Sequence, residues 1–105
     1  LGRYTPFFEM AKDVAYTHHE RWDGKGYPQG LAGTDIPLAG RIMAIADVYD
    51  ALVSERVYKA AMSHGQAVAG IATERGRHFD PALVDVFIEV APVFDRIHSR
   101  FADAA

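Results

Sequence analysis

The feature that most restricts the fold is a stretch rich in glycine and proline, residues 19–37. It contains four glycines and two prolines, namely Gly24, Gly26, Gly30, Gly33, Pro28 and Pro37. This composition excludes a helix or a strand across the stretch, because glycine makes regular backbone entropically costly and proline lacks an N–H donor. Unstructured segments of this length are uncommon in small domains and are usually functional or disordered. Regular structure must therefore form on either side of this loop.

On both sides of the loop, apolar residues recur with the period of a helix. The first helix is expected to open at Thr5 and Pro6, a capping residue followed by proline in the first turn, and to end near the histidine pair at 18–19. A second helix is expected to begin near Leu38. Its apolar stripe consists of Leu38, Ile42, Ile45, Tyr49 and Leu52. Residues 54–62 are expected to form an irregular connection.

Two further helices are expected in the second half of the chain. Ser63 and Gln66 have the spacing of a capping box that opens the third helix, and Gly76 is expected to end it. Asp80 can cap the fourth helix, with Pro81 in its first turn. The fourth helix carries an apolar seam that is expected to face the first two helices, made of Leu83, Phe87, Val90, Phe94, Ile97 and Phe101.

Pro92 is expected to kink the fourth helix or to divide it in two. No segment shows the alternation of a strand, an internal repeat or a domain linker. With 105 residues, of which 50% are hydrophobic and 24% charged, the chain suits one small core. The expected fold class is therefore all-α, with about four helices and one long loop in a single domain.

Charge and composition exclude several classes of function. The net charge of −3 argues against a binder of nucleic-acid polymers, which would be basic. Because the chain has no cysteine, it has no disulfide, no cysteine-bound zinc and no thiol nucleophile. No apolar run reaches membrane-spanning length, and the first residues lack a signal-peptide pattern. A cytoplasmic location is expected.

Two adjacent imidazoles, His18 and His19, stand directly before the loop. Asp47 lies among apolar neighbours in the second helix, where an unpaired carboxylate is costly, and Asp50 follows one turn later. Neutral imidazole and carboxylate are ligands that zinc, iron and manganese share. Spacing alone leaves two interpretations open. These residues are metal ligands, or the histidines are a helix cap or surface feature and Asp47 forms a structural salt bridge.

Arg56 and Lys59 form a second candidate pair, three positions apart. If that turn is helical, they point the same way and suit an anionic ligand, because arginine makes bidentate contacts to phosphate and lysine point contacts. The alternative is a solvated basic turn that pairs with Glu55 and Asp50.

Other polar residues are expected to have simpler roles. Two acids of the loop are expected to accept hydrogen bonds within it, namely Glu20 and Asp23. The remaining histidines have no acid or second imidazole at ligand spacing and are expected at the surface or as caps, namely His64, His78 and His98.

Four segments then carry a family resemblance: HHERWDGKGYPQGL at 18–31, IPLAGRIMAIADVYDAL at 36–52, SERVYKAA at 54–61 and GRHFDPALVDVF at 76–87. In order and spacing they resemble the HD-GYP family, a branch of the HD-type metal-dependent phosphohydrolases. The resemblance implies an all-helical domain with a cluster of divalent metal ions, typically iron or manganese. It also implies hydrolysis of the bacterial second messenger cyclic di-GMP to a linear dinucleotide or to GMP.

The resemblance also implies roles for individual residues. It makes metal ligands of His18, His19 and Asp47. It makes substrate-binding residues of Arg56 and Lys59, at the phosphates, and of Gly26, Tyr27 and Pro28, as a lip over the nucleotide. Asp50 is included with the substrate-binding residues.

The His-Asp doublet of the family does not occur in this chain. Residues 1–105 are therefore expected to be the C-terminal portion of an HD-GYP domain, with the doublet upstream of Leu1. The catalytic set is then incomplete, and the chain alone is expected to be inactive. The alternative is a non-catalytic HD-GYP module that binds a diguanylate cyclase (GGDEF) domain or a nucleotide. Apolar surface left open by absent helices predicts a homodimer.

Overall fold

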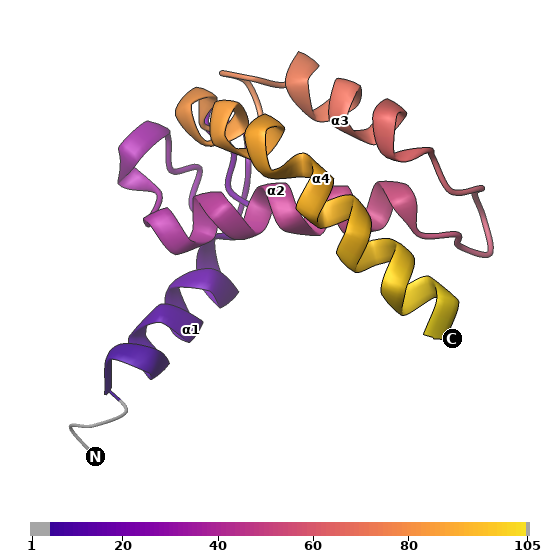
Figure 1. The fold of residues 1–105 in the computed structure, drawn as a ribbon. Coiled ribbons are helices and arrows are strands. Elements are labelled where there is room, and N and C mark those ends of the chain that lie inside the picture. The colour runs from indigo at the N-terminus through magenta and orange to yellow at the C-terminus, as the bar shows by residue number, and fades with distance from the viewer. Residues whose placement is uncertain (1–4, 105) are drawn as a thin grey trace.

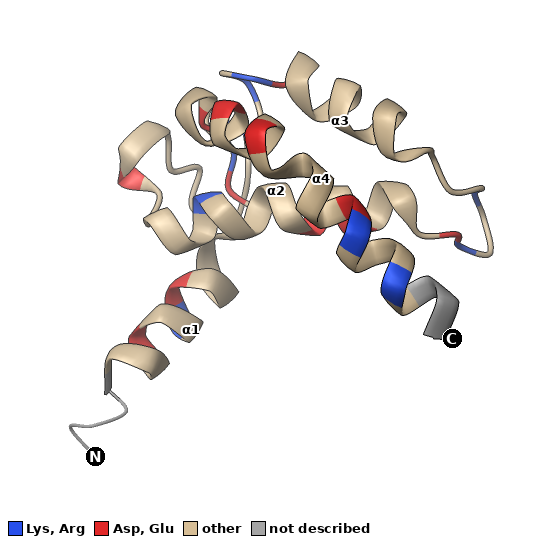
Figure 2. Cartoon of the chain, viewed as in Figure 1, with Lys and Arg blue, Asp and Glu red and all other residues tan. Residues whose placement is uncertain are grey.

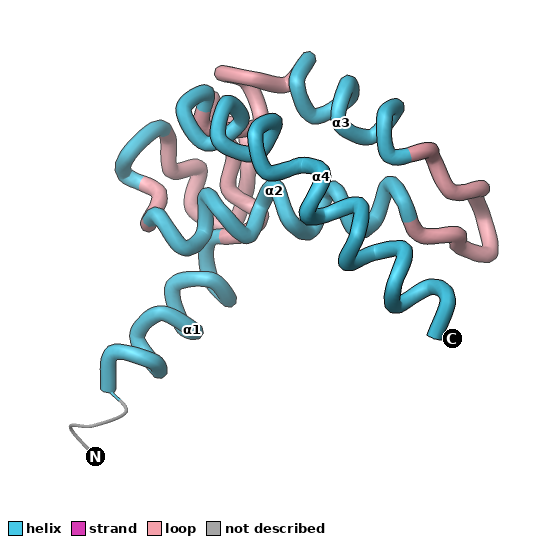
Figure 3. Tube along the Cα trace, in the orientation of Figure 1, coloured by secondary structure: helices cyan, strands magenta, loops and turns pink. Residues whose placement is uncertain are grey.

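The computed structural model describes the backbone of residues 5–104 and the side chains of residues 6–101. It contains four α-helices and one 3₁₀ turn: α1 (Thr5–Thr17), η1 (Gly33–Asp35), α2 (Leu38–Val53), α3 (His64–Thr73) and α4 (Pro81–Ala104). Loops join the helices, and no strand forms within residues 5–104 (Figure 3). The expected all-α fold is confirmed. The glycine-rich loop, expected to have no regular element, contains one short one, the turn η1.

The expected caps of α3 and α4 are present. Ser63 Oγ accepts from the backbone N–H of Gln66, whose side chain accepts in return from the N–H of Ser63. The Asp80 carboxylate accepts from the N–H of Ala82 at 2.9 Å. The end of α3 differs from the expectation, because the helix stops at Thr73 and Gly76 (φ +79°) lies in the turn that follows.

Pro92 does not divide α4, which continues through it to Ala104. Proline removes one helical hydrogen bond, but apolar packing holds the helix on both sides of this position. Ala91 is buried directly before the proline, and Phe94, two residues after it, packs against the core.

Helix α2 occupies the centre of the fold, and α1, α3 and α4 each pack against it (Figure 1). The core comes from α2, α3, the 74–80 turn and α4, with Tyr49, Ile71, Phe79 and Phe87 among its larger members. The seam of α4 thus faces α2 as expected, but its other partner is α3 rather than α1. Helix α1 points away from the other three helices and meets α2 near its own C-terminal end (Figure 1).

A close contact sets the crossing of α1 and α2. Gly40 is buried in α2, and a Cβ atom at this position would overlap Thr17 Oγ1 at the end of α1. The Thr17 hydroxyl in turn donates to the backbone carbonyl of Asp13. Only glycine lets the two backbones approach this closely, and this approach carries the end of α1 onto α2.

Apolar side chains remain uncovered on α1 and α4, among other parts of the described chain. On α1 these are Phe7, Phe8, Met10 and Tyr16, and on α4 they include Val90, Ile97 and Phe101. Two apolar grooves of about 390 and about 230 Å³ lie between α2 and α4. Among residues 5–104 no helix combines the length and the hydropathy that crossing a membrane requires.

Candidate active site

His18 lies one residue beyond α1, with its ring held from one side. Nδ1 is 2.7 Å from the backbone carbonyl oxygen of Val14. A carbonyl oxygen only accepts, so Nδ1 carries the proton and Nε2 of the neutral ring keeps its lone pair. That lone pair faces α2, where Asp47 Oδ2 lies 4.0 Å from Nε2. A histidine fixed through one nitrogen to a backbone carbonyl is oriented in the manner usual for metal ligands.

Asp47 is one of few charges on the central helix. Figure 2 shows α2 and α3 almost free of charged residues; α2 carries only Arg41, Asp47 and Asp50, and α3 carries none. The apolar burial expected for Asp47 was wrong, because its side chain is 54% exposed. It lies on an open face of α2, which gives both water and a ligand access to it.

His19 is adjacent to this pair, with its ring in a different environment. Its ring centroid is 3.9 Å from that of His18, and Tyr27 stacks on it at 5.0 Å with an interplanar angle of 22°. The backbone is linked as well, since the Tyr27 N–H donates to the His19 carbonyl at 3.2 Å. Tyr27 thus covers one side of the second imidazole.

The donor set of His18 and Asp47 fits a divalent ion of the zinc, iron or manganese class. Two ligand bonds of about 2.1 Å each span the 4.0 Å between the two atoms. Within the described part of the chain, however, no three His, Asp or Glu side chains converge tightly enough to hold one ion. The structure therefore brings His18 to Asp47, with His19 beside them, and the three-ligand assignment stays a prediction.

The side chain of Glu20 joins two parts of the loop that follows the histidines. This carboxylate accepts from the N–H of Gln29 at 2.8 Å and from the N–H of Leu31 at 2.9 Å. Gly26 lies against the base of the same loop, where a Cβ atom would come within 2.5 Å of Arg21 N and His19 O. The expected role of Glu20 as a hydrogen-bond acceptor in the loop is confirmed. Position 26 must be glycine, because there is no room for a Cβ atom.

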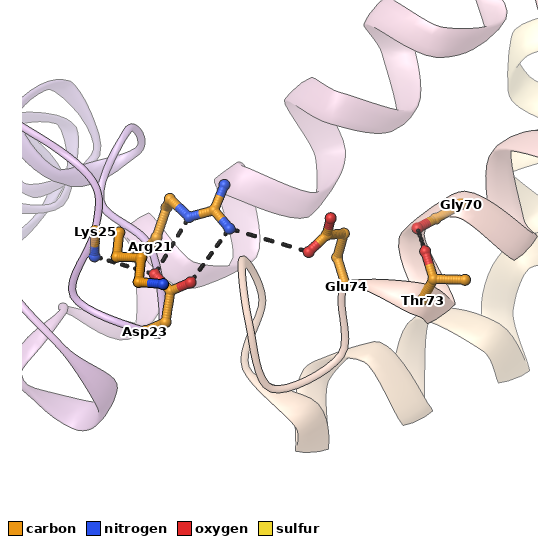
Figure 4. A network of polar contacts seen from close by, with 6 residues as sticks. All are labelled: Arg21, Asp23, Lys25, Gly70, Thr73 and Glu74. Atoms are coloured by element: carbon orange, nitrogen blue, oxygen red, sulfur yellow. Dashed lines mark hydrogen bonds and ion pairs between the residues drawn. The ribbon is translucent and has the colours of Figure 1, made fainter.

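The next part of the loop is joined to the turn between α3 and α4. Arg21 donates to both oxygens of Asp23 at 3.2 Å and lies 4.0 Å from Glu74, as Figure 4 shows. Asp23 also accepts from the N–H of Lys25, which confirms its expected role. The Arg21 hydrogen bonds hold the pKa of the Asp23 carboxyl below its usual value.

Two histidines are less exposed than expected. His78 is half-buried, stacks on Phe79 at 4.2 Å and accepts through its carbonyl from the N–H of Trp22. Burial, with a smaller contribution from nearby Arg21, lowers the pKa of the His78 imidazole. His64 Nδ1 lies 2.8 Å from the hydroxyl of buried Tyr49. Both were expected at the surface or as caps, and sequence spacing contained no sign of these tertiary partners.

Arg56 and Lys59 flank a tight turn within the connection at 54–62, which is irregular as expected, so the helical turn that would align their side chains does not form. Each donates its backbone N–H to the other's carbonyl, at 3.0 and 3.1 Å. Residues paired in this way start from the same face of the ladder, and Lys59 Nζ donates to the carbonyl of Ala60 at 3.3 Å. Neither forms an ion pair within residues 6–101, and Asp50 instead lies 3.5 Å from Ser54 Oγ. The alternative interpretation, a basic turn paired with Glu55 and Asp50, is therefore not observed among these residues.

The turn between Arg56 and Lys59 exposes Val57 and Tyr58, the latter to 81%. Like charges that lie opposite each other on paired backbone are unfavourable. A groove of about 390 Å³ runs along residues 54–58. Arg56 and Lys59 have no acidic partner among residues 6–101, so this turn suits an anionic ligand.

Comparisons with known proteins agree with these features. A model of the HD domain matches residues 3–83. A protein of Vibrio cholerae named cyclic di-GMP phosphodiesterase is 57% identical over 99 residues, which are 94% of this chain and 20% of that protein. The cyclic di-GMP phosphodiesterase response regulator RpfG of Xanthomonas campestris is 43% identical over 104 residues, 99% of this chain and 28% of the relative.

A third relative carries a different substrate in its name. The 3'3'-cGAMP-specific phosphodiesterase 2 of Vibrio cholerae is 46% identical over 95 residues, 90% of this chain and 18% of that protein. The chain thus spans less than a third of the length of each of these relatives.

Proposed function

The chain belongs to the HD domain family, in its HD-GYP branch, and we propose that it forms the C-terminal portion of a domain that hydrolyses cyclic di-GMP. The names of two relatives support this substrate. The observation that carries the proposal is His18, whose Nδ1 is bound to Val14 O while Nε2 faces Asp47 at 4.0 Å. A tautomer fixed in this way, beside a carboxylate, is prepared for a divalent ion.

We assign His18, His19 and Asp47 as ligands of a divalent ion, with iron or manganese as the preferred metals. When bound, a metal cluster supplies Lewis-acid activation of the scissile phosphodiester and of the attacking water. The chain's own part is to hold two imidazoles and a carboxylate at the meeting of α1 and α2. The remaining ligands, including the His-Asp doublet of the family, we place upstream of Leu1 in the longer protein.

We assign Arg56 and Lys59 to the phosphates of the substrate. Their side chains lack an acidic partner within the described chain, and their backbones pair across the turn. A phosphodiester would supply the negative partner that both cations lack. Asp50 is exposed on α2, one turn after Asp47, and is proposed to contact the nucleotide.

Gly26, Tyr27 and Pro28 are proposed to form the lip over the nucleotide. Tyr27 already stacks on His19 and leaves most of its ring exposed. That exposed aromatic surface can pack on a purine and limit the access of water to the bond that breaks. Since cyclic di-GMP is an intracellular messenger, the proposed location is the cytoplasm.

The test is turnover by the complete protein supplied with manganese. Cyclic di-GMP should give a linear dinucleotide or GMP on chromatography, and 3'3'-cGAMP should be assayed in parallel because one relative is named for it. Asp47→Asn should lower kcat/KM by at least about 100-fold, the scale of losing a ligand or its orienting partner. Asp35→Asn, an exposed acid in η1, is the matched control and should leave turnover unchanged.

Full activity of the Asp47→Asn variant would disprove the metal assignment. Tight binding of cyclic di-GMP without turnover by the complete protein would instead favour the second candidate, a non-catalytic module for nucleotide or GGDEF-domain binding. Preference for 3'3'-cGAMP would keep the reaction and change the substrate.

A further inference from the structure

We infer that Glu20 is a positioning residue: its buried carboxylate holds the loop that places Tyr27 over His19. Glu20 follows the histidine pair directly and is only 2% exposed. Burying a carboxylate in a small domain is unfavourable unless its charge is compensated. Within the described residues no cation pairs with Glu20, so its charge is met by backbone donors alone.

The two donors come from the far side of the loop. Glu20 Oε2 accepts from Gln29 at 2.8 Å and Oε1 from Leu31 at 2.9 Å. Both bonds join a carboxylate to an N–H, a class stronger than a neutral hydrogen bond. The residues between Glu20 and Gln29 are thereby closed into a compact loop, and the segment that bears Tyr27 lies inside it.

The contacts at the tip are weaker than those at the base. Tyr27 is 62% exposed, and its stack on His19 and one backbone hydrogen bond at 3.2 Å hold it. Gly26 makes close approach possible by lacking a Cβ atom, but it provides no attraction of its own. The carboxylate of Glu20 is therefore the side-chain anchor of the part of the loop that follows Tyr27, whereas Arg21 and Asp23 anchor the part before it.

Glu20 is buried, but it holds the loop and does not belong to the apolar core between the helices. Loss of its charge should open the loop locally, because both hydrogen bonds of this carboxylate go to backbone N–H groups of the same loop. With one oxygen replaced by an NH₂ group, a glutamine meets one of the two N–H donors with a donor of its own. Glutamine keeps the shape of the side chain but loses one acceptor oxygen. The substitution therefore tests the hydrogen bonds of Glu20 separately from its packing.

The experiment compares Glu20→Gln, Glu20→Asp and Glu89→Gln in the complete protein. Glu89 is an exposed acid on α4 and is the matched control. Lys25 is exposed within the loop, so tryptic cleavage after Lys25, followed by mass spectrometry, reports loop opening. Loss of the charged hydrogen bond should raise the rate of this cleavage by at least about tenfold in Glu20→Gln. Glu20→Asp, which keeps the charge and reaches one donor at a time, should lie between that variant and the wild type.

The effect on turnover rests on the proposed function. There, Glu20→Gln should raise KM for cyclic di-GMP more than it lowers kcat, because the lip would be displaced while the ligand side chains stay. Unchanged cleavage after Lys25 in Glu20→Gln would overturn the inference, as would cleavage in Glu20→Asp no slower than in Glu20→Gln. Cleavage that rises only in step with the loss of global stability in urea would also overturn it. A wild-type protein without turnover would refute the proposed function but leave the cleavage comparison decisive for Glu20.

Discussion

Arg41 Nη1 and Asp80 Oδ2 form an ion pair of 2.7 Å that joins α2 to the start of α4. Their side chains are only 16% and 7% exposed. Arg41 also donates through Nε to the carbonyl of Ile36, and Asp80 caps α4 at Ala82. The pair therefore fixes the end of the glycine-rich loop, the central helix and the last helix relative to one another.

Asp80→Asn should destabilise the chain strongly. Asparagine can still cap α4, but Arg41 is left nearly buried without a counter-charge, a change that typically costs about 3–5 kcal/mol. The measurement is the free energy of unfolding in urea. Asp85→Asn removes the exposed pair of Arg75 and Asp85 and should have a much smaller effect. Equal effects of the two substitutions would show that burial does not set the strength of the first pair.

Gly40→Ala should disturb the contact between α1 and α2. The new Cβ atom overlaps Thr17 Oγ1, so the helices must move apart at an expected cost of about 1–3 kcal/mol. Gly70→Ala on α3 meets no atom within 4 Å and should stabilise the helix by about 1 kcal/mol. Adding Thr17→Ala to Gly40→Ala should recover part of the loss, and no recovery in the double variant would contradict this explanation.

These cases show which parts of the structure can be predicted from the sequence. Helix starts are local, and Ser63 with Gln66 announces α3 through a capping box that requires only its own four residues. The partnership of Arg41 with Asp80 joins residues far apart in sequence, and no periodicity encodes it. The same holds for the hydrogen bond between Tyr49 and His64.

In the candidate site, too, some features can be predicted from the sequence and others depend on tertiary contacts. The histidine pair and the glycines of the loop are recognisable as a motif, whereas the orientation of each ring depends on contacts made after folding. Val14 O fixes the ring of His18, and Tyr27 holds that of His19. The connection at 54–62 was expected to be irregular, but the backbone pairing of Arg56 with Lys59 could not be read from their spacing of three, which suits both a helical turn and a tight turn.

Gly26→Ala should impair the lip without unfolding the domain. A Cβ atom within 2.5 Å of the backbone at Arg21 and His19 cannot be accommodated by a side-chain movement. The loop must shift, and Tyr27 with it, so KM for cyclic di-GMP should rise by about tenfold, the scale of a displaced aromatic contact. Gly65→Ala, which meets no atom within 4 Å, is the control. Wild-type KM in Gly26→Ala would mean that the lip does not contact substrate.

The free energy of unfolding should decrease as the pH falls, because the imidazole of His78 is half-buried in its neutral form. Burial holds the pKa of the folded-state imidazole below 6.5, so the unfolded chain binds its proton first as the pH falls. The contribution is fully present above about pH 6.5 and is lost as the pH decreases through that value towards the lower folded-state pKa. Arg21 adds to the lowering, while Glu74 and Asp23 oppose it. Urea unfolding between pH 7.5 and about 5 should show a shallower pH dependence in His78→Gln than in the wild type, and identical slopes would contradict this assignment.

The uncovered apolar faces should make the 105-residue chain associate. Phe7 and Phe8 on α1 and Phe101 on α4 are largely exposed, and apolar surface of this kind drives association in water. Light scattering should show a mass that rises with concentration towards a dimer. Replacing Phe7 and Phe8 with serine should shift the equilibrium towards the monomer, whereas Ser99→Ala, an exposed position of α4, should not. A monodisperse monomer at high concentration would contradict the expectation.

The 105-residue chain by itself should hydrolyse cyclic di-GMP negligibly even with added manganese. Among its described residues no three candidate side chains converge on one ion, and only His18 and Asp47 face each other directly. Cleavage of a phosphodiester by a metal cluster requires ions held about 3.5–4 Å apart, which this set alone does not provide. Weak binding of cyclic di-GMP through Arg56 and Lys59 should persist and fall with added salt, because exposed charges are screened. The measurement is product formation by the chain and by the complete protein at equal concentration. Substantial product from the chain, abolished by His19→Ala, would show that these residues suffice without the upstream ligands.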